Sequence, residues 1–101
     1  MPVIDGHNDT LLRLAEHDGD PVAAFVDGNP DIHIDLPRAR EGSLGTGLFA
    51  SYVPNEGERP DAVETDEGYE YPLADAVDRE RAKRITYETL ALLHRLDAEV
   101  D

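Results

Sequence analysis

The sequence predicts an α/β fold in which a strand, short helices, a second strand and a long helix follow one another. Residues 3–7 and 44–53 are apolar runs of the kind that form strands in parallel sheets. Residues 72–100 repeat their apolar side chains with helical spacing. Alternating strands and helices are the repeating unit of α/β folds. A right-handed crossover would place the two strands side by side with the helices outside.

The first elements are short and separated by turn residues. Residues 3–7 are expected to form a buried strand. A helical turn should follow over residues 11–15, where the side chain of Asp9 or Thr10 can accept a free backbone N–H as the N-cap. The first strand therefore ends directly at the start of a helix.

Two further short helices carry start signals that combine an aspartate with a proline. Asp20 followed by proline predicts a helix over residues 22–26. Asp35, followed two residues later by proline, predicts a single helical segment that stops at Gly42. The connection between the two strands is therefore expected to be a broken series of helices.

The second half is predicted as a strand, a loop and a long helix. Residues 44–53 begin with glycines, continue as a nearly unbroken apolar run and stop at a proline. Residues 55–70 contain seven carboxylates and no periodic apolar face, so we expect a loop. Residues 72–100 are predicted as one helix with Pro72 in its first turn. Its apolar stripe consists of Ala82, Ile85, Thr89, Leu92, Leu93 and Leu96.

The chain is strongly acidic, with 23 Asp and Glu residues, 9 Lys and Arg residues and a formal net charge of −14. An acidic surface repels phosphates, so we expect no nucleic-acid partner and no membrane partner. Arg38 and Arg40 should form solvated ion pairs. Lys83 is the only lysine, and acid-rich, lysine-poor surfaces suit concentrated salt. We therefore favour a halophilic source, with a merely acidic protein as the alternative.

The length and cysteine content limit the number of domains and the kinds of site that the chain can contain. A chain of 101 residues has room for one small domain. It contains no cysteine, which excludes disulfides and thiolate ligands and fits a reducing cytosol. We expect no signal peptide before the first strand, and no apolar run reaches the length of a membrane span. The expected location is cytoplasmic.

A His-x-Asp pair stands at the end of the first predicted strand. His7 and Asp9 are two residues apart, so alternation along a strand would project both side chains to one face. An imidazole and a carboxylate in this arrangement can ligate a hard or borderline metal ion. The same pair also suits a solvated polar strand end, and the spacing leaves both interpretations open.

The segment IDGHND at residues 4–9 is followed by HIDLPRAREG at residues 33–42 and by LGTGLFASYVP at residues 44–54. Together these blocks resemble the N-terminal part of the membrane (renal) dipeptidase family, zinc peptidases with a (β/α)8-barrel fold. In that family an Asp-Gly-His-Asn-Asp segment closes the first strand, and a Leu-Pro-x-x-Arg-x-Gly turn precedes an aromatic-rich second strand. The similarity runs from Val3 to about Leu96. Asp9 favours this branch over related hydrolases that open with His-x-His.

The resemblance implies that residues 1–101 are the truncated N-terminal strand–helix–strand–helix portion of a single (β/α)8 TIM-type metallopeptidase domain, because a full barrel needs about 250 residues. It implies that His7 and Asp9 ligate one zinc (Zn2+) of a two-zinc centre, whose activated hydroxide attacks a peptide bond. The family's bridging glutamate and two further histidines would lie beyond Asp101. We therefore expect no catalytic side chain within this span and no activity from the span alone.

Other polar residues near His7 and Asp9 could serve either the metal site or the local structure. Asp5 shares a strand face with His7 and is expected either to accept the second imidazole N–H or to bond to a neighbouring strand. His33 lies near the rim of the site, where the expected role is a hydrogen bond that fixes its own loop. His17 and His94 are expected on the surface.

The resemblance predicts a zinc-dependent dipeptidase whose substrate is a dipeptide with a free terminal carboxylate. A homodimer is the assembly expected of the full-length enzyme. Two alternatives stay open. One is another metal-dependent barrel hydrolase, such as an amidase or a lactonase. The other is a non-enzymatic acidic α/β module, complete at 101 residues, in which the His-x-Asp pair is incidental.

Overall fold

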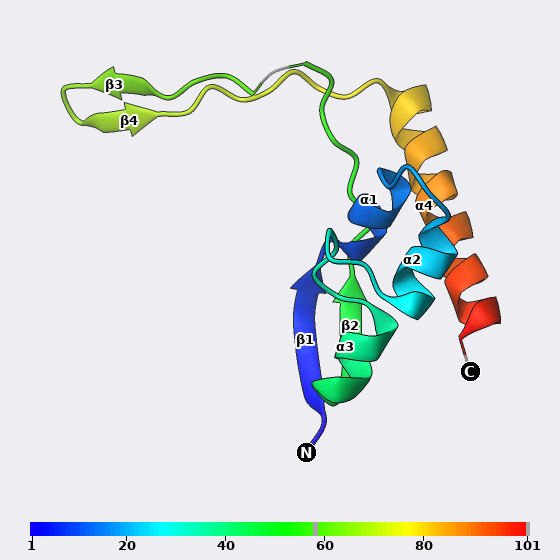
Figure 1. The fold of residues 1–101 in the computed structure, drawn as a ribbon. Helices are drawn as coiled ribbons and strands as arrows, with labels where there is room; N and C mark the ends of the chain where they lie inside the picture. The colour runs from blue at the N-terminus through cyan, green and yellow to red at the C-terminus, as the bar shows by residue number, and fades with distance from the viewer. Residues whose placement is uncertain (58, 101) are drawn as a thin grey trace.

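The computed structural model describes residues 1–57 and 59–100, and it confirms the mixed α/β class. β1 and β2 pair in parallel, and β3 and β4 form a separate antiparallel hairpin. Within the described residues the parallel sheet has two strands, so the barrel itself is not shown (Figure 1). The elements in chain order are β1 (Val3–Asn8), α1 (Thr10–Ala15), α2 (Pro21–Asp27), α3 (Leu36–Glu41), β2 (Leu44–Phe49), β3 (Val63–Thr65), β4 (Gly68–Glu70) and α4 (Arg79–Glu99).

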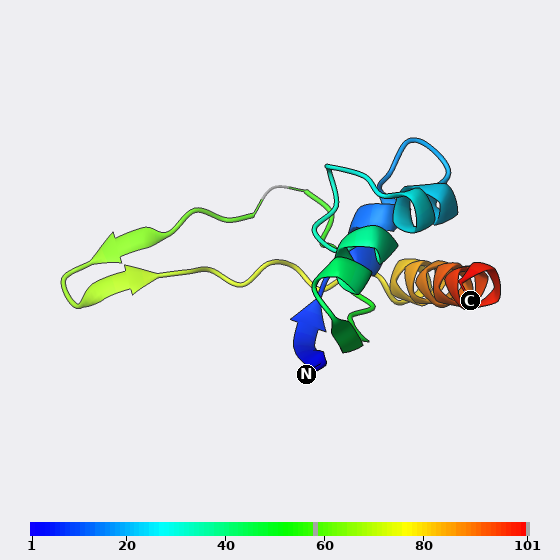
Figure 2. The same ribbon diagram turned by 60° about the horizontal axis from the view of Figure 1, so that its bottom comes forward.

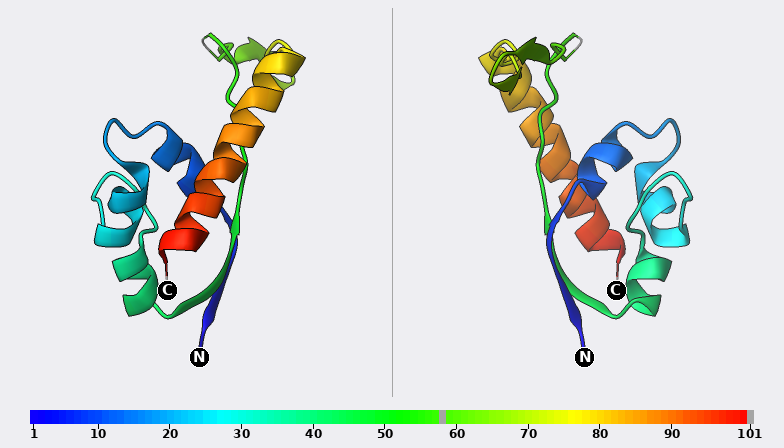
Figure 3. Two further views of the ribbon diagram at one scale, coloured as in Figure 1. Left: turned by 90° about the vertical axis from the view of Figure 1, so that its right-hand side faces the viewer. Right: turned by 90° about the vertical axis from the view of Figure 1, so that its left-hand side faces the viewer.

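The hydrophobic core lies where α1, α2 and α4 meet. α1 packs against α2 and α4, and α2 also packs against α4. Figure 3 shows α4 running alongside these short helices. Leu11, Leu14 and Ile32 are the most completely buried large side chains, so α1 and the loop before α3 supply the centre of the core. The core cluster consists of Leu11, Leu14, Val22, Ala24, Phe25, Ile32, Leu92 and Leu96.

Aspartates cap three of the helices. The side chains of Asp20, Asp35 and Asp78 each accept a hydrogen bond from a backbone N–H in the first turn of α2, α3 and α4, respectively. Proline follows in the first turn of α2 and α3. The predicted starts of α2 and α3 are therefore confirmed in detail.

The parallel strands are less buried than the sequence suggested. Ile4 in β1 is 76% exposed, and Leu48 in β2 is 61% exposed. Parallel strands become buried on both faces only when further strands and helices cover them, and the described residues cover these two only in part, through α3 and the packing of Phe49 against the core. β2 also ends at Phe49, four residues before the predicted end at Val53.

The predicted loop over residues 55–70 was wrong where β3 and β4 form, and the predicted helix over residues 72–100 is confirmed only from Arg79 to Glu99. β3 and β4 pair from Val63 with Glu70 to Thr65 with Gly68, and Gly68 has a φ of +138°, which favours glycine. Helix α4 begins only after Asp78, which caps it. Glu58 lies outside the described residues.

The hairpin stands at the end of an extended arm that leaves the body after β2 and returns before α4 (Figures 1 and 2). The radius of gyration is 16.9 Å, against about 13 Å for a compact chain of this length. Hydrogen bonds join the two sides of the arm at its base. Asn55 Nδ2 donates to the carbonyl of Asp75 at 2.8 Å, and Arg81 donates to the carbonyl of Pro54 at 2.6 Å.

α4 has the length needed to cross a bilayer but carries charged side chains along its course. None of the helices in the described part of the chain combines sufficient length with sufficient apolarity to span a membrane.

A buried ion pair, here called the Asp35–Arg38 clasp, holds the loop before α3. Asp35 is 2% exposed, and its carboxylate accepts hydrogen bonds from the backbone N–H groups of Asn29 and Arg38 and from the Arg38 guanidinium. Arg38 Nη2 also donates to the carbonyls of Asn29 and Ile32, at 2.6 Å each. The hydrogen bond from the Arg38 side chain lowers the pKa of Asp35 below its ordinary value, although burial opposes this shift. Arg38 is therefore not the solvated ion pair that was expected.

Replacing Asp35 with alanine should destabilise the chain more than replacing Asp20 with alanine. Both changes remove an N-cap, which costs about 1 kcal/mol. Only Asp35→Ala also leaves the partly buried N–H groups of Asn29 and Arg38 without their buried acceptor, so we expect a total loss of at least about 2 kcal/mol. Urea unfolding followed by circular dichroism measures both values, and equal losses would contradict the role of the clasp.

The clasp should also make stability depend on acid pH. Because the pKa of Asp35 is lowered in the folded chain, its contribution is fully present above the unfolded value of about 3.9 and is lost as the pH falls through the folded value. Asp35→Asn keeps the shape of the side chain but does not titrate. The stability advantage of the wild type over this variant should therefore shrink from about pH 4 to pH 2. A constant difference across that range would contradict the prediction.

Candidate metal centre

The candidate site lies where β1 ends and the chain turns into α1. The pairing of β1 with β2 is irregular between Asp5 and Asn8, and such irregularities re-aim side chains beside functional sites. Asp9 lies outside the strand as the N-cap residue of α1, with φ −106° and ψ 30°. This is the sparsely populated bridge region in which many active-site residues are found. The turn, and not strand alternation as predicted, brings Asp9 beside His7.

The two predicted ligand residues lie together in the structure. Nε2 of His7 is 3.5 Å from Oδ1 of Asp9, and both side chains are exposed to solvent. Two ligand atoms that are each 2.0–2.2 Å from a tetrahedral zinc are separated by about 3.3–3.6 Å. The donor set and its spacing therefore fit two neighbouring ligands of one zinc ion.

The side chain of Asn8 holds this turn from both sides. Its Nδ2 donates to Oδ2 of Asp5 at 2.8 Å, and its Oδ1 accepts from the backbone N–H of Thr10 at 3.2 Å. The second contact is an Asx turn, a motif that asparagine favours. Asp5 was expected to bond to His7 or to a neighbouring strand. Its carboxylate instead accepts from Asn8. No role was predicted for Asn8, although an asparagine two residues before a helix is a usable signal for such a turn.

The pair opens onto a hollow of about 350 Å³ between the β1–α1 turn and the loop before α3. His33 and Ile34 reach the hollow from that loop, and Arg13 reaches it from α1. His33 makes no side-chain hydrogen bond within the described residues. The hydrogen bonds that fix its loop come from the Asp35–Arg38 clasp. The expected loop-fixing role of His33 was therefore wrong. The hollow is lined by Asp5, His7, Asn8, Asp9, Thr10, Arg13, His33 and Ile34.

Residues 1–57 and 59–100 contain no group of three or more His, Cys, Asp or Glu side chains placed to hold a metal ion. His7 and Asp9 are two donors, whereas a structural zinc takes four protein ligands and a catalytic zinc takes three with water in the fourth position. The described residues can therefore hold part of a zinc site.

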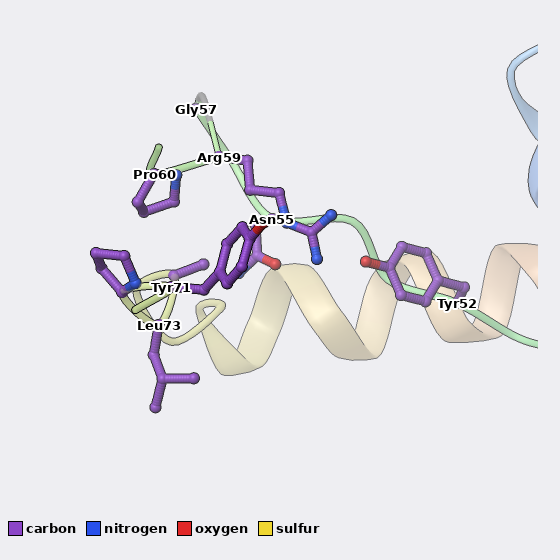
Figure 4. Close-up of a pocket in the computed structure, with 9 residues that line it drawn as sticks. Tyr52, Asn55, Gly57, Arg59, Pro60, Tyr71 and Leu73 are labelled. Atoms are coloured by element: carbon purple, nitrogen blue, oxygen red, sulfur yellow. The ribbon is translucent and has the colours of Figure 1, made fainter. Parts of the chain in front are cut away.

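A larger hollow of about 730 Å³ lies at the base of the arm. Figure 4 shows the guanidinium of Arg59 extending between the rings of Tyr71 and Tyr52. Its described lining residues include no imidazole and no carboxylate, so its chemistry does not suit a zinc site. It shares no lining residue with the hollow at His7 and Asp9.

The fold and the site together define an α/β unit with a candidate metal centre at the carboxyl end of a parallel strand. Residues 1–97 match the family model described as membrane dipeptidase, peptidase family M19. The chain belongs to this family, which confirms the resemblance drawn from its two sequence blocks.

The chain is similar to three further proteins, two of which are described as dipeptidases. A crystal structure described as that of the dipeptidase AC, a metallopeptidase of family M19, superposes with a TM-score of 0.78 and 32% identity over 97% of this chain. The dipeptidase ataJ of Aspergillus terreus is 29% identical over 100 residues, 98% of this chain. An uncharacterized protein in the PQQ-III 3' region of Acinetobacter calcoaceticus is 45% identical over 56 residues, 54% of this chain.

The match covers only part of each of these proteins. The chain spans 18% and 22% of the length of the two curated relatives and 26% of the crystallised dipeptidase. The structure is therefore a mixed α/β fragment that is similar to part of an M19 dipeptidase.

Proposed function

We propose that the chain provides the first two zinc ligands, His7 and Asp9, of a zinc-dependent dipeptidase. One observation carries the proposal: Nε2 of His7 and Oδ1 of Asp9 lie 3.5 Å apart at the carboxyl end of a parallel strand. In barrel enzymes the active site lies at this end of the strands. Membership of the M19 family and a crystallised relative described as a dipeptidase supply further support.

His7 and Asp9 supply the two donor types that zinc combines in peptidase sites. The imidazole of His7 binds as a neutral ligand, and the carboxylate of Asp9 offsets part of the metal's charge. When bound, a zinc pair lowers the pKa of a water to about 7 and polarises the peptide carbonyl. The proposed substrate is a dipeptide with a free terminal carboxylate. The names of two relatives support the dipeptidase part of this proposal.

We further propose that residues 1–101 are the N-terminal part of a (β/α)8 domain whose other strands supply the remaining ligands. The exposed faces of β1 and β2 support this, since Ile4 and Leu48 have no cover. A Cβ added to Gly6 in β1 would meet no atom within 4 Å, so the described chain packs nothing against it. The acidic composition, with one lysine, supports a halophilic source, and the lack of cysteine supports a cytoplasmic location.

Zinc binding should depend on both proposed ligands. Isothermal titration of Zn2+ into the chain at fixed ionic strength should show affinity reduced at least about tenfold in His7→Ala and in Asp9→Ala, because each removes one of the two donors. His94→Ala, which removes an exposed imidazole on α4, serves as the matched control and should bind like the wild type. Unchanged affinity in His7→Ala would place the zinc elsewhere.

Activity should require the rest of the domain. The chain alone is expected to hydrolyse no dipeptide. It offers two protein ligands, whereas a catalytic zinc takes three. Fusing it to the three quarters of the crystallised dipeptidase that it does not match should restore hydrolysis. His7→Ala in the fusion should abolish that activity, whereas His94→Ala should preserve it. Turnover by the chain alone, or an active His7→Ala fusion, would contradict the proposal.

A further inference from the structure

We infer that Asn8 is a positioning residue for the proposed metal site: it keeps the carboxylate of Asp9 from capping helix α1 and so leaves that carboxylate free to bind zinc. The inference rests on the proposed function, because it takes Asp9 to be a zinc ligand. Asn8 is not itself a ligand in this arrangement and acts only through Asp9.

Asp9 differs from the other aspartates that stand at the N-cap of a helix. Asp20, Asp35 and Asp78 have ψ angles of 112°, 168° and 135°, and the side chain of each accepts a backbone N–H. Asp9 occupies the same position in α1, but its ψ is 30° and its side chain accepts no such hydrogen bond. An extended backbone at the N-cap aims the side-chain oxygen at the first turn of the helix. The backbone of Asp9 does not do so, and its carboxylate lies beside His7 instead.

Asn8 fixes the backbone on both sides of Asp9. Its Oδ1 accepts from the N–H of Thr10 at 3.2 Å, and its Nδ2 donates to Asp5 at 2.8 Å, so the amide is held at both ends. The carbonyl of Asn8 accepts from the N–H of Ala50 at 2.9 Å, which ties it to the end of β2. Rotation of Asp9 to an extended ψ would turn the N–H of Thr10 away from Oδ1. The bond from Thr10 to Asn8 therefore opposes the conformation that capping needs.

Strand β2 restricts the orientation of the Asn8 amide. Asn8 is half-buried, and a Cβ added to Gly47 would lie 3.3 Å from its Nδ2 and 2.9 Å from the ring of Phe49. The amide thus lies close against the backbone of β2 at Gly47. This contact favours the orientation in which the side chain bridges Asp5 and Thr10.

A free carboxylate matters for zinc because capping and metal binding compete for the same oxygens. If Asp9 capped α1 for part of the time, the apparent zinc affinity would fall by the fraction of molecules in which the carboxylate is free. Residues that orient a metal ligand in this way typically change metal affinity about 10–100-fold when they are substituted.

A double-mutant cycle on zinc affinity tests whether Asn8 acts through Asp9. In isothermal titration of Zn2+ into the chain, Asn8→Ala should weaken binding about tenfold. In the Asp9→Ala background the same change should alter affinity by less than about twofold, because the group that Asn8 positions is already absent. Asn55→Ala removes an amide hydrogen bond at the base of the arm. It is the matched control and should bind zinc like the wild type.

A second cycle on stability, measured without zinc, tests the competition with capping. Asp9→Ala should leave the urea midpoint of the wild type almost unchanged, because Asp9 accepts no capping hydrogen bond there. In the Asn8→Ala background Asp9 can adopt the extended backbone and cap α1, so Asp9→Ala should lower the midpoint. A merely structural role for Asn8 would lower the midpoint to the same extent with and without Asp9.

Asn8→Ser separates the two hydrogen bonds of the amide. A serine hydroxyl can still accept from the N–H of Thr10, although more weakly, but it offers no amide donor to Asp5. This variant should recover part of the zinc affinity that Asn8→Ala loses. It also replaces Asn8→Ala in both cycles if the alanine variant does not fold.

The proposed function and the role of Asn8 fail in different ways. If Asp9→Ala leaves zinc affinity unchanged, both are overturned. If Asp9→Ala weakens binding but Asn8→Ala does not, or weakens it equally in both backgrounds, only the role of Asn8 is overturned. The same holds if Asp9→Ala costs no stability in the Asn8→Ala background, since Asp9 then does not compete for the cap.

Discussion

A buried carboxylate must be paired and hydrogen-bonded, and the pairing of Asp35 with Arg38 organises the chain between the two parallel strands. An unpaired charge at a position that is 2% exposed would be costly. Arg38 provides the counter-charge and also binds the carbonyls of Asn29 and Ile32. This one ion pair therefore caps α3, seats Ile32 in the core and sets the loop that forms one wall of the hollow at His7.

Much of the fold could be predicted from local signals. Asp20 and Asp35 were recognised as helix starts because capping depends on residues only two or three positions apart. His7 and Asp9 were predicted to share a strand face, and they do lie together, but the turn after Asn8 brings them there and not strand alternation. The features that could not be predicted depend on partners far along the chain. The exposure of Ile4 and Leu48 follows from which strands and helices cover them, and no local pattern contains that information.

Three features were misread or passed over in the sequence. Residues 63–70 form strands of only three residues each, and their many carboxylates hide the short alternation that such strands provide. Arg38 was expected to form a solvated ion pair because acidic residues lie near it in the sequence, whereas its partner in the structure, Asp35, is buried. Asn8 was passed over because its two contacts, to Asp5 and to the N–H of Thr10, exist only after the strand has ended and the helix has begun.

The two ends of the parallel sheet differ in the chain segments that they carry. At the starting end, the N–H of Val3 donates to the carbonyl of Ser43 at 2.8 Å, and Ser43 takes a left-handed conformation with φ 57°. That end closes the α3–β2 turn against β1 and contains no candidate ligand. At the other end, β1 leads to His7 and Asp9, and β2 leads into the arm. Because the strands are parallel, these chain exits share one edge. In barrel enzymes conservation of the starting end serves stability while the carboxyl end holds the chemistry. In this unit the proposed ligands His7 and Asp9 lie at the carboxyl end, and the α3–β2 turn closes the starting end.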